Sequence, residues 1–197
     1  MGAILKKRVK SPKRKRLPNV LSDAEARAVI GRVRKPVARI ACLLMYACGL
    51  RISEAATLEV TRIDGVNGLI RVVGKGNKER CVPVPAPVLA ELRQLWKTHG
   101  NKRWLCPNQK GDGPVARHTL WDTFSKVIGE AGIKARVTPH TLRHSYATRL
   151  IECGVPLRIV QILLGHASIG TTALYTHLTE PIRADLKLLL DKLMSGL

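Results

Sequence analysis

The stretch from Thr138 to Tyr175 contains, close together, the side-chain types that chemistry on a phosphate group requires. His140 and Arg143 form an H-x-x-R pair, and His166 follows in the triplet LGH. Tyr175 lies nine residues further on. A guanidinium binds two phosphate oxygens and stays charged, an imidazole transfers protons near neutral pH, and a deprotonated phenol is a nucleophile. The combination therefore indicates phosphate chemistry with a covalent step.

The H-x-x-R pair falls on a helix that we predict for residues 139–153. At about 100° of rotation per residue, His140, Arg143 and His144 share an arc of about 100°. The opposite side carries apolar residues that can face a core (Leu142, Tyr146 and Leu150). The helix N-terminus adds a favourable dipole and unpaired N–H groups for an anion. Taken alone, the same arc is equally compatible with ordinary surface contacts.

A second arginine, Arg51, follows Gly49 and Leu50 at the end of a predicted apolar helix. In this place the backbone holds the cation, and Glu54 is expected to hold the guanidinium from one turn later. An Arg51–Glu54 surface pair is the alternative. For Tyr175, which follows Ala173 and Leu174, simple packing is the alternative when the residue is taken alone.

Length and charge narrow the function further. The chain has 197 residues, which suits one domain or slightly more. Its formal net charge is +20, and the first eighteen residues, with eight Lys or Arg and no acid, leave +12 on the rest. A folded domain this basic is expected to bind a polyanion, most simply nucleic acid. A solvated basic surface is the alternative.

Other classes of protein fit less well. The five cysteines are odd in number and show no C-x-x-C spacing, which is typical of reduced, intracellular packing residues. His140 and His144 lack the glutamate of an H-E-x-x-H zinc motif, so we expect no metal site. No signal peptide follows the charged start, and the longest apolar run, residues 40–48, is too short to span a membrane.

The residue pattern predicts a mixed α+β fold that is mainly α-helical. Residues 1–20 are expected to form a basic, flexible arm or linker remnant. The capping box Ser22–Glu25 begins a helix over residues 23–33, and Ser53 is expected to cap a short one. Alternating residues 69–73 and 79–84 predict a hairpin, with residues 63–64 as a third antiparallel strand. Further helices are predicted at 37–48, 87–99, 118–132, 139–153, 157–164, 170–177 and 181–194.

Four stretches in this order resemble the catalytic domain of the tyrosine recombinase, or phage integrase, family, in the Xer-type form. They are GLRISEAATL, VVGKGNKER, HTLRHSYAT and LLGHASIGTTALYTH. Each motif is weak alone, but their order and local contexts are highly specific. The resemblance covers roughly residues 20–195, so we expect residues 21–197 to form that catalytic domain.

The resemblance implies a role for six residues. Arg51, Arg143, His140 and His166 would bind the non-bridging oxygens of the scissile phosphate, and Lys75 would protonate the leaving 5′ oxygen. Tyr175 would attack phosphorus and leave a 3′-phosphotyrosyl bond with a free 5′-hydroxyl. The protein–DNA bond keeps the phosphoester energy, so neither ATP, nor a metal, nor another cofactor is expected. His144 matches no catalytic position of the family, and we expect it either to support the catalytic residues or to pack, while Glu54 is expected to hold Arg51.

The same resemblance implies partners. Double-stranded DNA is the expected substrate, and low-specificity phosphate contacts are expected from Lys78, Arg80, Arg117, His118 and Lys126. A homotetramer on DNA is expected, with a monomer in its absence. The C-terminal segment Pro181 to Met194 would dock either on a neighbouring protomer or on its own domain. The expected location is the bacterial cytoplasm, at the nucleoid and away from membranes.

One departure from the family keeps alternatives open. Family members usually carry an N-terminal core-binding domain, whereas only the basic arm precedes Leu21 here. We therefore expect a truncated or naturally minimal form with weak, salt-sensitive DNA binding. A recombinase-derived regulator, or an enzyme that only cleaves and relaxes DNA, are the alternatives to full strand exchange. An RNA-binding protein would explain the charge but not the set of catalytic residue types.

Overall fold

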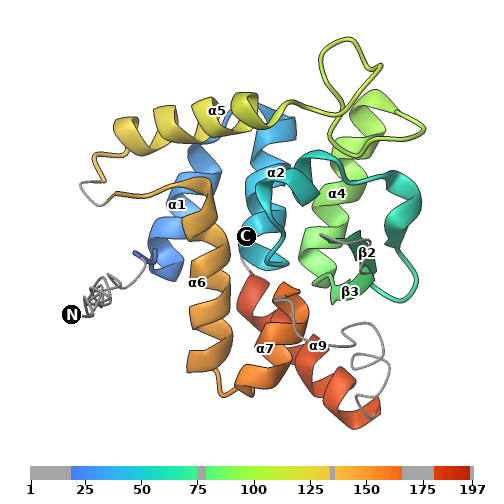
Figure 1. Ribbon diagram of the computed structural model, residues 1–197, viewed down its shortest axis with the longest axis vertical. Helices are drawn as coiled ribbons and strands as arrows, with labels where there is room; N and C mark the ends of the chain where they lie inside the picture. Colours follow the sequence, from blue (N-terminus) through green and yellow to red (C-terminus); the bar gives the residue numbers. More distant parts are fainter. Residues whose placement is uncertain (1–18, 75–78, 134–135, 166–179, 196–197) are drawn as a thin grey trace, which may run out of the picture.

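The computed structural model describes residues 19–74, 79–133, 136–165 and 180–195, with the side chains of the last segment from residue 185. The N-terminal elements, as far as residue 83, are α1 (Asp23–Arg32), α2 (Pro36–Ala47), α3 (Ile52–Ala56), the short 3-10 helix η1 (Val60–Arg62), β1 (Ile63–Asp64), β2 (Leu69–Val73) and β3 (Glu79–Pro83). The elements that follow in the chain are the helices α4 (Ala86–His99), α5 (Arg117–Glu130), α6 (Pro139–Glu152), α7 (Leu157–Leu164) and α9 (Glu180–Met194) (Figure 1).

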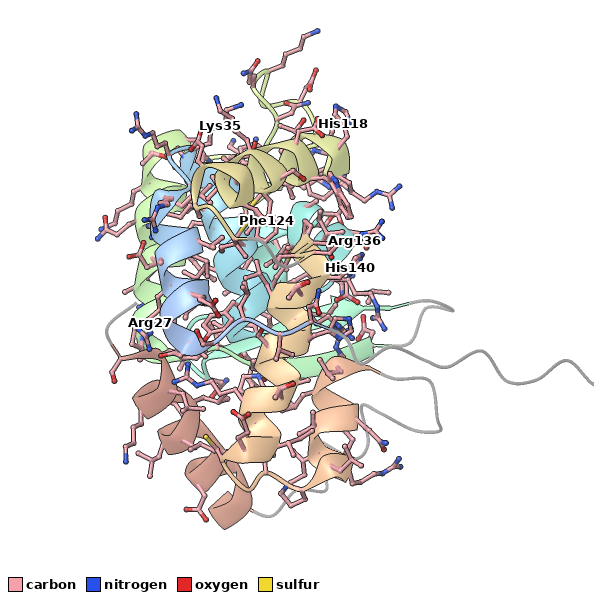
Figure 2. The ribbon with its side chains drawn as sticks, turned by 90° about the vertical axis from the view of Figure 1, so that its left-hand side faces the viewer. Arg27, Lys35, His118, Phe124, Arg136 and His140 are labelled. Atoms are coloured by element: carbon pink, nitrogen blue, oxygen red, sulfur yellow. The ribbon has the colours of Figure 1, made fainter. Side chains whose placement is uncertain are left out.

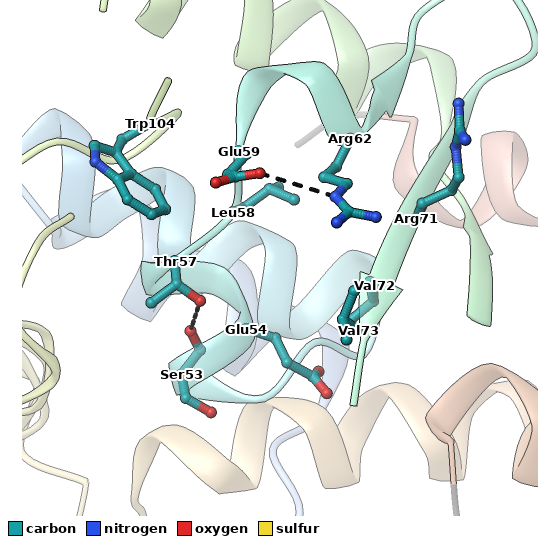
Figure 3. A pocket seen from close by; sticks show the side chains of 10 residues that line it. All are labelled: Ser53, Glu54, Thr57, Leu58, Glu59, Arg62, Arg71, Val72, Val73 and Trp104. Atoms are coloured by element: carbon teal, nitrogen blue, oxygen red, sulfur yellow. Dashed lines mark hydrogen bonds and ion pairs between the residues drawn. The ribbon is translucent and has the colours of Figure 1, made fainter. Parts of the chain in front are cut away.

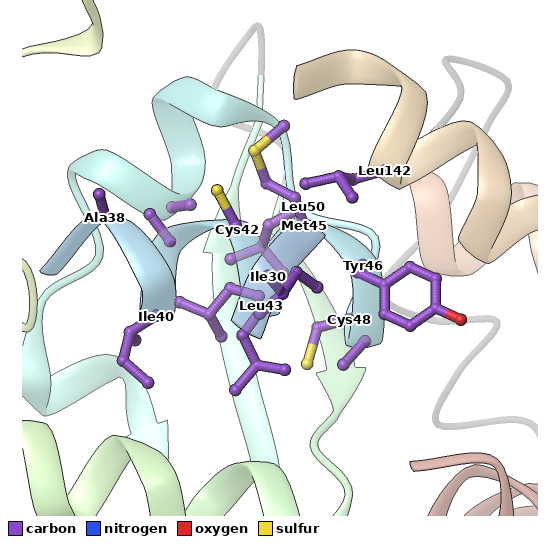
Figure 4. Close-up of a cluster of buried hydrophobic side chains, with 14 of the residues drawn as sticks. Ile30, Ala38, Ile40, Cys42, Leu43, Met45, Tyr46, Cys48, Leu50 and Leu142 are labelled. Carbon is purple, nitrogen blue, oxygen red and sulfur yellow. The ribbon is translucent and has the colours of Figure 1, made fainter. Parts of the chain in front are cut away.

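Helix α2 lies at the centre of the fold. Its sequence is apolar on nearly every face, so it is stable only where other elements remove all sides from water. Helices α1, α3, α4, α5 and α6 pack around it, and its side chains from Ile40 to Ala47 are all buried. Figure 4 shows Leu142 of α6 and Leu50 among these side chains. This main core holds the segment that leads to Arg51.

The three strands form an antiparallel sheet in the order β1-β2-β3. Ile70 of β2 pairs with Val82 of β3, and Val72 pairs with Arg80. Because side chains alternate between the two faces of a strand, these four share one face, and all four are buried. The sheet thus turns an arginine toward the interior of the domain.

A second apolar cluster joins the C-terminal elements. Tyr146 and Leu150 of α6 and Leu163 of α7 pack in one cluster with Leu186 and Leu190 of α9. Helix α9 therefore packs on its own domain in this structure.

Polar contacts fix the end of α9. Asp191 Oδ1 accepts a hydrogen bond of 2.7 Å from the backbone N–H of Ala86, at the start of α4. Arg27 and Arg149 both donate to the carbonyl of Leu193, at 2.9 and 3.2 Å. The last turn of α9 is thereby tied to α1, α4 and α6.

The predicted mixed fold and its three-stranded antiparallel sheet are confirmed. Each predicted helix within the described ranges is present, with its ends shifted by at most two residues; the helix predicted at 170–177 lies outside them. The prediction that Ser53 caps α3 is wrong. Arg51 occupies the N-cap position, because Glu54 lies three residues after it and accepts its backbone N–H at 2.7 Å.

Within the described segments, no helix has both the length and the apolar character that crossing a membrane requires. The same segments contain no group of three or more His, Cys, Asp or Glu placed to hold a metal ion. The five cysteines are free, and three of them are buried (Cys42, Cys48 and Cys106).

Candidate active site

Arg51 is held at both its backbone and its side chain. The chain leaves α2 through Gly49, whose φ is +62°, and Leu50 is fully buried in the main core. Glu54 then accepts the backbone N–H of Arg51 on Oε2 and its Nη1 on Oε1, both at 2.7 Å. The Arg51 side chain keeps 36% of its surface exposed, so its remaining donors can reach a ligand from solvent.

Glu54 is the carboxylate at which the arginines meet. Its side chain is 7% exposed, and Arg80 donates to both of its oxygens, from Nη1 at 2.9 Å and from Nη2 at 2.7 Å. Burial would raise the pKa of Glu54, but the hydrogen bonds and charge of Arg80, with the bonds from Arg51, lower that pKa to about 2. Glu54 is therefore ionised at neutral pH.

Arg143 lies inside the domain. It is 7% exposed, its Nη1 donates to the Gly49 carbonyl, and its Nη2 donates to the Leu164 carbonyl at 2.5 Å. Its Nη1 is 3.8 Å from Glu54 Oε2. Burial, and then the charges of Arg51 and Arg80, lower the pKa of Arg143 to about 10, so it remains a cation at neutral pH.

All three arginines approach backbone carbonyls at the C-terminal end of α7. Arg80 Nε donates to the Leu163 carbonyl at 2.9 Å, and Arg143 donates to the next carbonyl, that of Leu164. Arg51 Nη2 is 3.4 Å from the Gly165 carbonyl. The last carbonyls of a helix have no partner within the helix and carry a partial negative charge. The arginines satisfy them and fix the chain directly before His166.

The two histidines of α6 differ from Arg143 in burial. His140 and His144 are exposed, one turn apart on the helix that also carries Arg143. Partial burial, and then the charges of His140 and Arg143, lower the pKa of His144. Figure 2 shows His140 along the same edge of the molecule as Arg136 and His118. Of the three residues predicted to share one arc of the helix, His140 and His144 are therefore exposed and Arg143 is buried.

An open groove of about 430 Å³ adjoins the arginine cluster. It lies between α3, η1 and β2 (Figure 3), with Glu54 on one wall and the cations of Arg62 and Arg71 on the other. Arg62 is 3.9 Å from Glu59, which lies beside it at the start of η1. Of the cluster residues only Glu54 lines this groove, and Arg51, Arg80 and Arg143 do not.

The predicted site residues therefore fall into three groups. Arg51, Glu54 and Arg143 lie together, with His140 and His144 exposed on the same helix as Arg143. Arg117, His118 and Lys126 are exposed on α5, and Lys126 is 4.0 Å from Glu130. Apart from Arg80, the other residues predicted for catalysis or DNA contact lie outside the described residues (Lys75, Lys78, His166 and Tyr175).

Arg80 requires a correction. We predicted that it contacts DNA, but it is 2% exposed and its three donor groups are directed to Glu54 and Leu163. It therefore presents no free guanidinium to a phosphate. The sequence contained a signal for this burial, because Arg80 alternates in phase with the apolar residues Val82, in β3, and Val84, directly after it.

Comparison with known proteins shows the family of this chain. The sequence model of the phage integrase family matches residues 20–181. The tyrosine recombinase XerD of Lacticaseibacillus casei is 39% identical, over 88% of this chain and 63% of its own length. The tyrosine recombinase XerA of Pyrococcus furiosus is 37% identical, over 96% of this chain and 69% of its own length. The chain thus spans less than two thirds of the first of these relatives.

Solved structures show the same fold. The integrase from mycobacterium phage Brujita superposes with a TM-score of 0.75 at 27% identity, over 95% of this chain and 61% of that protein. The XerH site-specific recombinase in its pre-cleavage complex with difH substrate gives a TM-score of 0.68 at 27% identity, over 90% of this chain and 56% of that protein. The chain belongs to the phage integrase family, and Xer-type tyrosine recombinases are among its relatives.

Proposed function

We propose that this chain is the catalytic domain of a site-specific DNA recombinase that cleaves and rejoins strands through a 3′-phosphotyrosyl intermediate. One observation carries the proposal. Three arginines converge on a single carboxylate, and their three positive charges against the one negative charge of Glu54 leave an excess of two. Like charges held together at low exposure are costly unless an anion compensates them.

The compensating anion would be a phosphodiester of DNA. The Arg51 side chain is 36% exposed and has donors left over, whereas Arg80 and Arg143 are buried, so the anion would bind at Arg51. His140, exposed at the second position of α6, adds a donor at a helix N-terminus. Preorganised donors of this kind stabilise the charge that builds on the non-bridging oxygens during phosphoryl transfer. The related XerH was solved with a difH substrate, which supports DNA as the ligand.

The chemical steps follow from the family resemblance. The phenol oxygen of Tyr175 would form a bond to phosphorus while the bond from phosphorus to the 5′ oxygen breaks. The phenolic proton would be lost to a base, and Lys75 would supply a proton to the leaving 5′ oxygen. Religation reverses these steps with a different 5′ end. The number of phosphoester bonds is unchanged, so the reaction would require no ATP, and the arginine and histidine donors would supply the charge stabilisation that a metal ion gives other phosphoryl-transfer enzymes.

Binding would involve more of the surface than the reacting groups. Exposed Arg117 and His118 in the first turn of α5 and Lys126 further along that helix are proposed phosphate contacts, with Lys78 of the hairpin. The net charge of +20 supports binding that is driven by counterion release and falls steeply with salt. These contacts would position the protein without reading sequence.

Assembly and location are part of the same proposal. We place the protein on nucleoid DNA in a bacterial cytoplasm, with residues 1–20 as a basic arm. A tetramer on DNA would form through the segment Pro181 to Met194. In a monomer the same segment would keep the packing on its own domain that Asp191 and Leu190 make here.

The test is covalent capture. The chain is incubated in EDTA with nicked suicide substrates, prepared as a fragment pool from the native locus, and a denaturation-resistant protein–DNA adduct is sought. We expect an adduct with the unmodified chain and none with Tyr175→Phe. Salt-sensitive DNA binding without any adduct would refute the catalytic proposal and favour a regulatory DNA-binding protein.

A further inference from the structure

Arg80 is a charged residue at a buried position of the sheet, where an apolar side chain is expected. It lies on the core-facing side of β3, opposite Val72 in the strand register, and its neighbours on that face of the sheet are apolar. Removing a guanidinium from water costs several kcal/mol unless its donors are satisfied and its charge is paired. An apolar residue would fill such a row at lower cost, so the arginine must contribute something that packing does not require.

The contacts of Arg80 show what it contributes. Its two Nη atoms bind the two oxygens of Glu54 in a fork, at 2.9 and 2.7 Å. Its Nε donates to the Leu163 carbonyl at 2.9 Å. A fork of this kind fixes both the position and the plane of a carboxylate, because two parallel bonds remove its freedom to rotate. The same two oxygens receive Arg51.

The chain also makes room for this side chain. Gly165, at the end of α7, has a φ of +62°, and a Cβ built there would come within 2.9 Å of Arg80 Cδ. The residue directly before His166 therefore packs face to face with the arginine. Arg80 contacts both segments from which phosphate-binding residues come, the start of α3 and the end of α7.

We infer that Arg80 is a positioning residue of the active site, whose fork on Glu54 sets the direction of the Arg51 guanidinium and whose bond to Leu163 holds the end of α7. This inference rests on the proposed function, since it assigns Arg51 to the scissile phosphate. Arg80 itself does not touch the DNA. Its removal therefore impairs the chemical step while DNA binding is preserved.

The first measurement separates binding from chemistry. For Arg80→Met we expect the single-turnover rate of adduct formation to fall on the order of 100-fold, the loss that a displacement of about 1 Å at a reacting site can cause. We expect the slope of log Kd against log salt to stay unchanged. Loss of a phosphate contact would instead reduce that slope by about 0.9. Arg93→Met, which removes an exposed arginine bonded to one backbone carbonyl, is the matched control and keeps the full rate.

The second measurement asks whether Arg80 acts through Glu54. The groups that face this carboxylate are Arg51, Arg80 and Arg143, and Arg80 contributes most to keeping it ionised. Without Arg80, the pKa of Glu54 rises, so more of this carboxylate is protonated as the pH is lowered. We therefore expect the rate of adduct formation by Arg80→Met, divided by that of the unmodified chain, to decrease as the pH falls from 7.5 to 5. In a Glu54→Gln background this extra pH dependence disappears. Arg80→Met then adds little to the loss that Glu54→Gln already causes.

Arg80→Lys covers the case in which Arg80→Met does not fold, as judged by circular dichroism. Lysine restores the charge but cannot form the fork, so we expect a folded protein with a rate between those of the methionine variant and the unmodified chain. A full rate in Arg80→Lys, or effects of Arg80 and Glu54 substitutions that multiply, would overturn the inference. Absence of an adduct from the unmodified chain would overturn the proposed function first, and the positioning role with it.

Discussion

Substitution of Gly49 by alanine tests the geometry between α2 and Arg51 most directly. Gly49 has a φ of +62°, a conformation that costs an L-residue about 1–2 kcal/mol. A Cβ at this position would come within 2.6 Å of Tyr146 Cδ1, 2.7 Å of Tyr146 Cε1 and 3.1 Å of Leu164 Cδ2. The Tyr146 ring is buried and cannot move aside without displacing α6. Overpacking of this kind costs about 1–3 kcal/mol.

The two costs together predict a loss of roughly 2–5 kcal/mol in the free energy of unfolding. For a domain of this size, each kcal/mol corresponds to about 2–4 °C in Tm. Gly100→Ala is the matched control, because Gly100 has a φ of +57° with nothing within 4 Å of a Cβ. It isolates the backbone cost, so we expect it to lower the free energy of unfolding by only about 1–2 kcal/mol.

Thermal unfolding followed by circular dichroism would measure both variants, and urea unfolding would give the free energies. The Gly49 carbonyl also accepts a hydrogen bond from Arg143, so Gly49→Ala should slow adduct formation even at temperatures where the variant is folded. Equal losses of Tm in Gly49→Ala and Gly100→Ala would refute the proposed contact with Tyr146. A full cleavage rate in folded Gly49→Ala would refute the coupling to Arg143.

Three further predictions follow from contacts elsewhere in the structure. Glu54 has a pKa of about 2 in the folded protein against an ordinary value of 4.5. At about 1.4 kcal/mol per pKa unit, this lowered pKa contributes about 3 kcal/mol to the free energy of unfolding above pH 4.5. The contribution is lost as the pH falls toward 2. Urea titrations across this range should therefore show a smaller acid-induced loss in Glu54→Gln. Asp191→Ala removes the acceptor for the Ala86 N–H at the start of α4 and should lower the free energy of unfolding by about 1 kcal/mol. Asparagine keeps an oxygen acceptor, so Asp191→Asn should lose only a small part of this stability. An equal loss in the two variants would contradict this. Leu190→Ala in the second core should cost about 2–5 kcal/mol, whereas Leu188→Ala, whose side chain is 69% exposed on the same helix, should change the Tm little; similar losses would contradict the packing of α9 on its own domain.

The local pattern of the sequence determined the elements and the candidate residue types. The capping box at Ser22 predicted the start of α1, and the alternation along β2 and β3 predicted the hairpin, because caps and strand faces depend on residues a few positions apart. The four recombinase-like motifs likewise identified Arg51 and Arg143 by their immediate neighbours. Such short-range signals are readable without knowing which elements meet in space.

Only the tertiary structure decided what these side chains do. Arg143 was predicted to project from its helix and is buried instead, because the Gly49 and Leu164 carbonyls come to it from α2 and α7. Arg80 was predicted on the DNA surface and is buried against Glu54, which lies 26 residues away in the sequence. A guanidinium can leave water only where acceptors and an opposite charge surround it. Those partners come from separate elements, so the burial of a charged residue depends on how the elements pack.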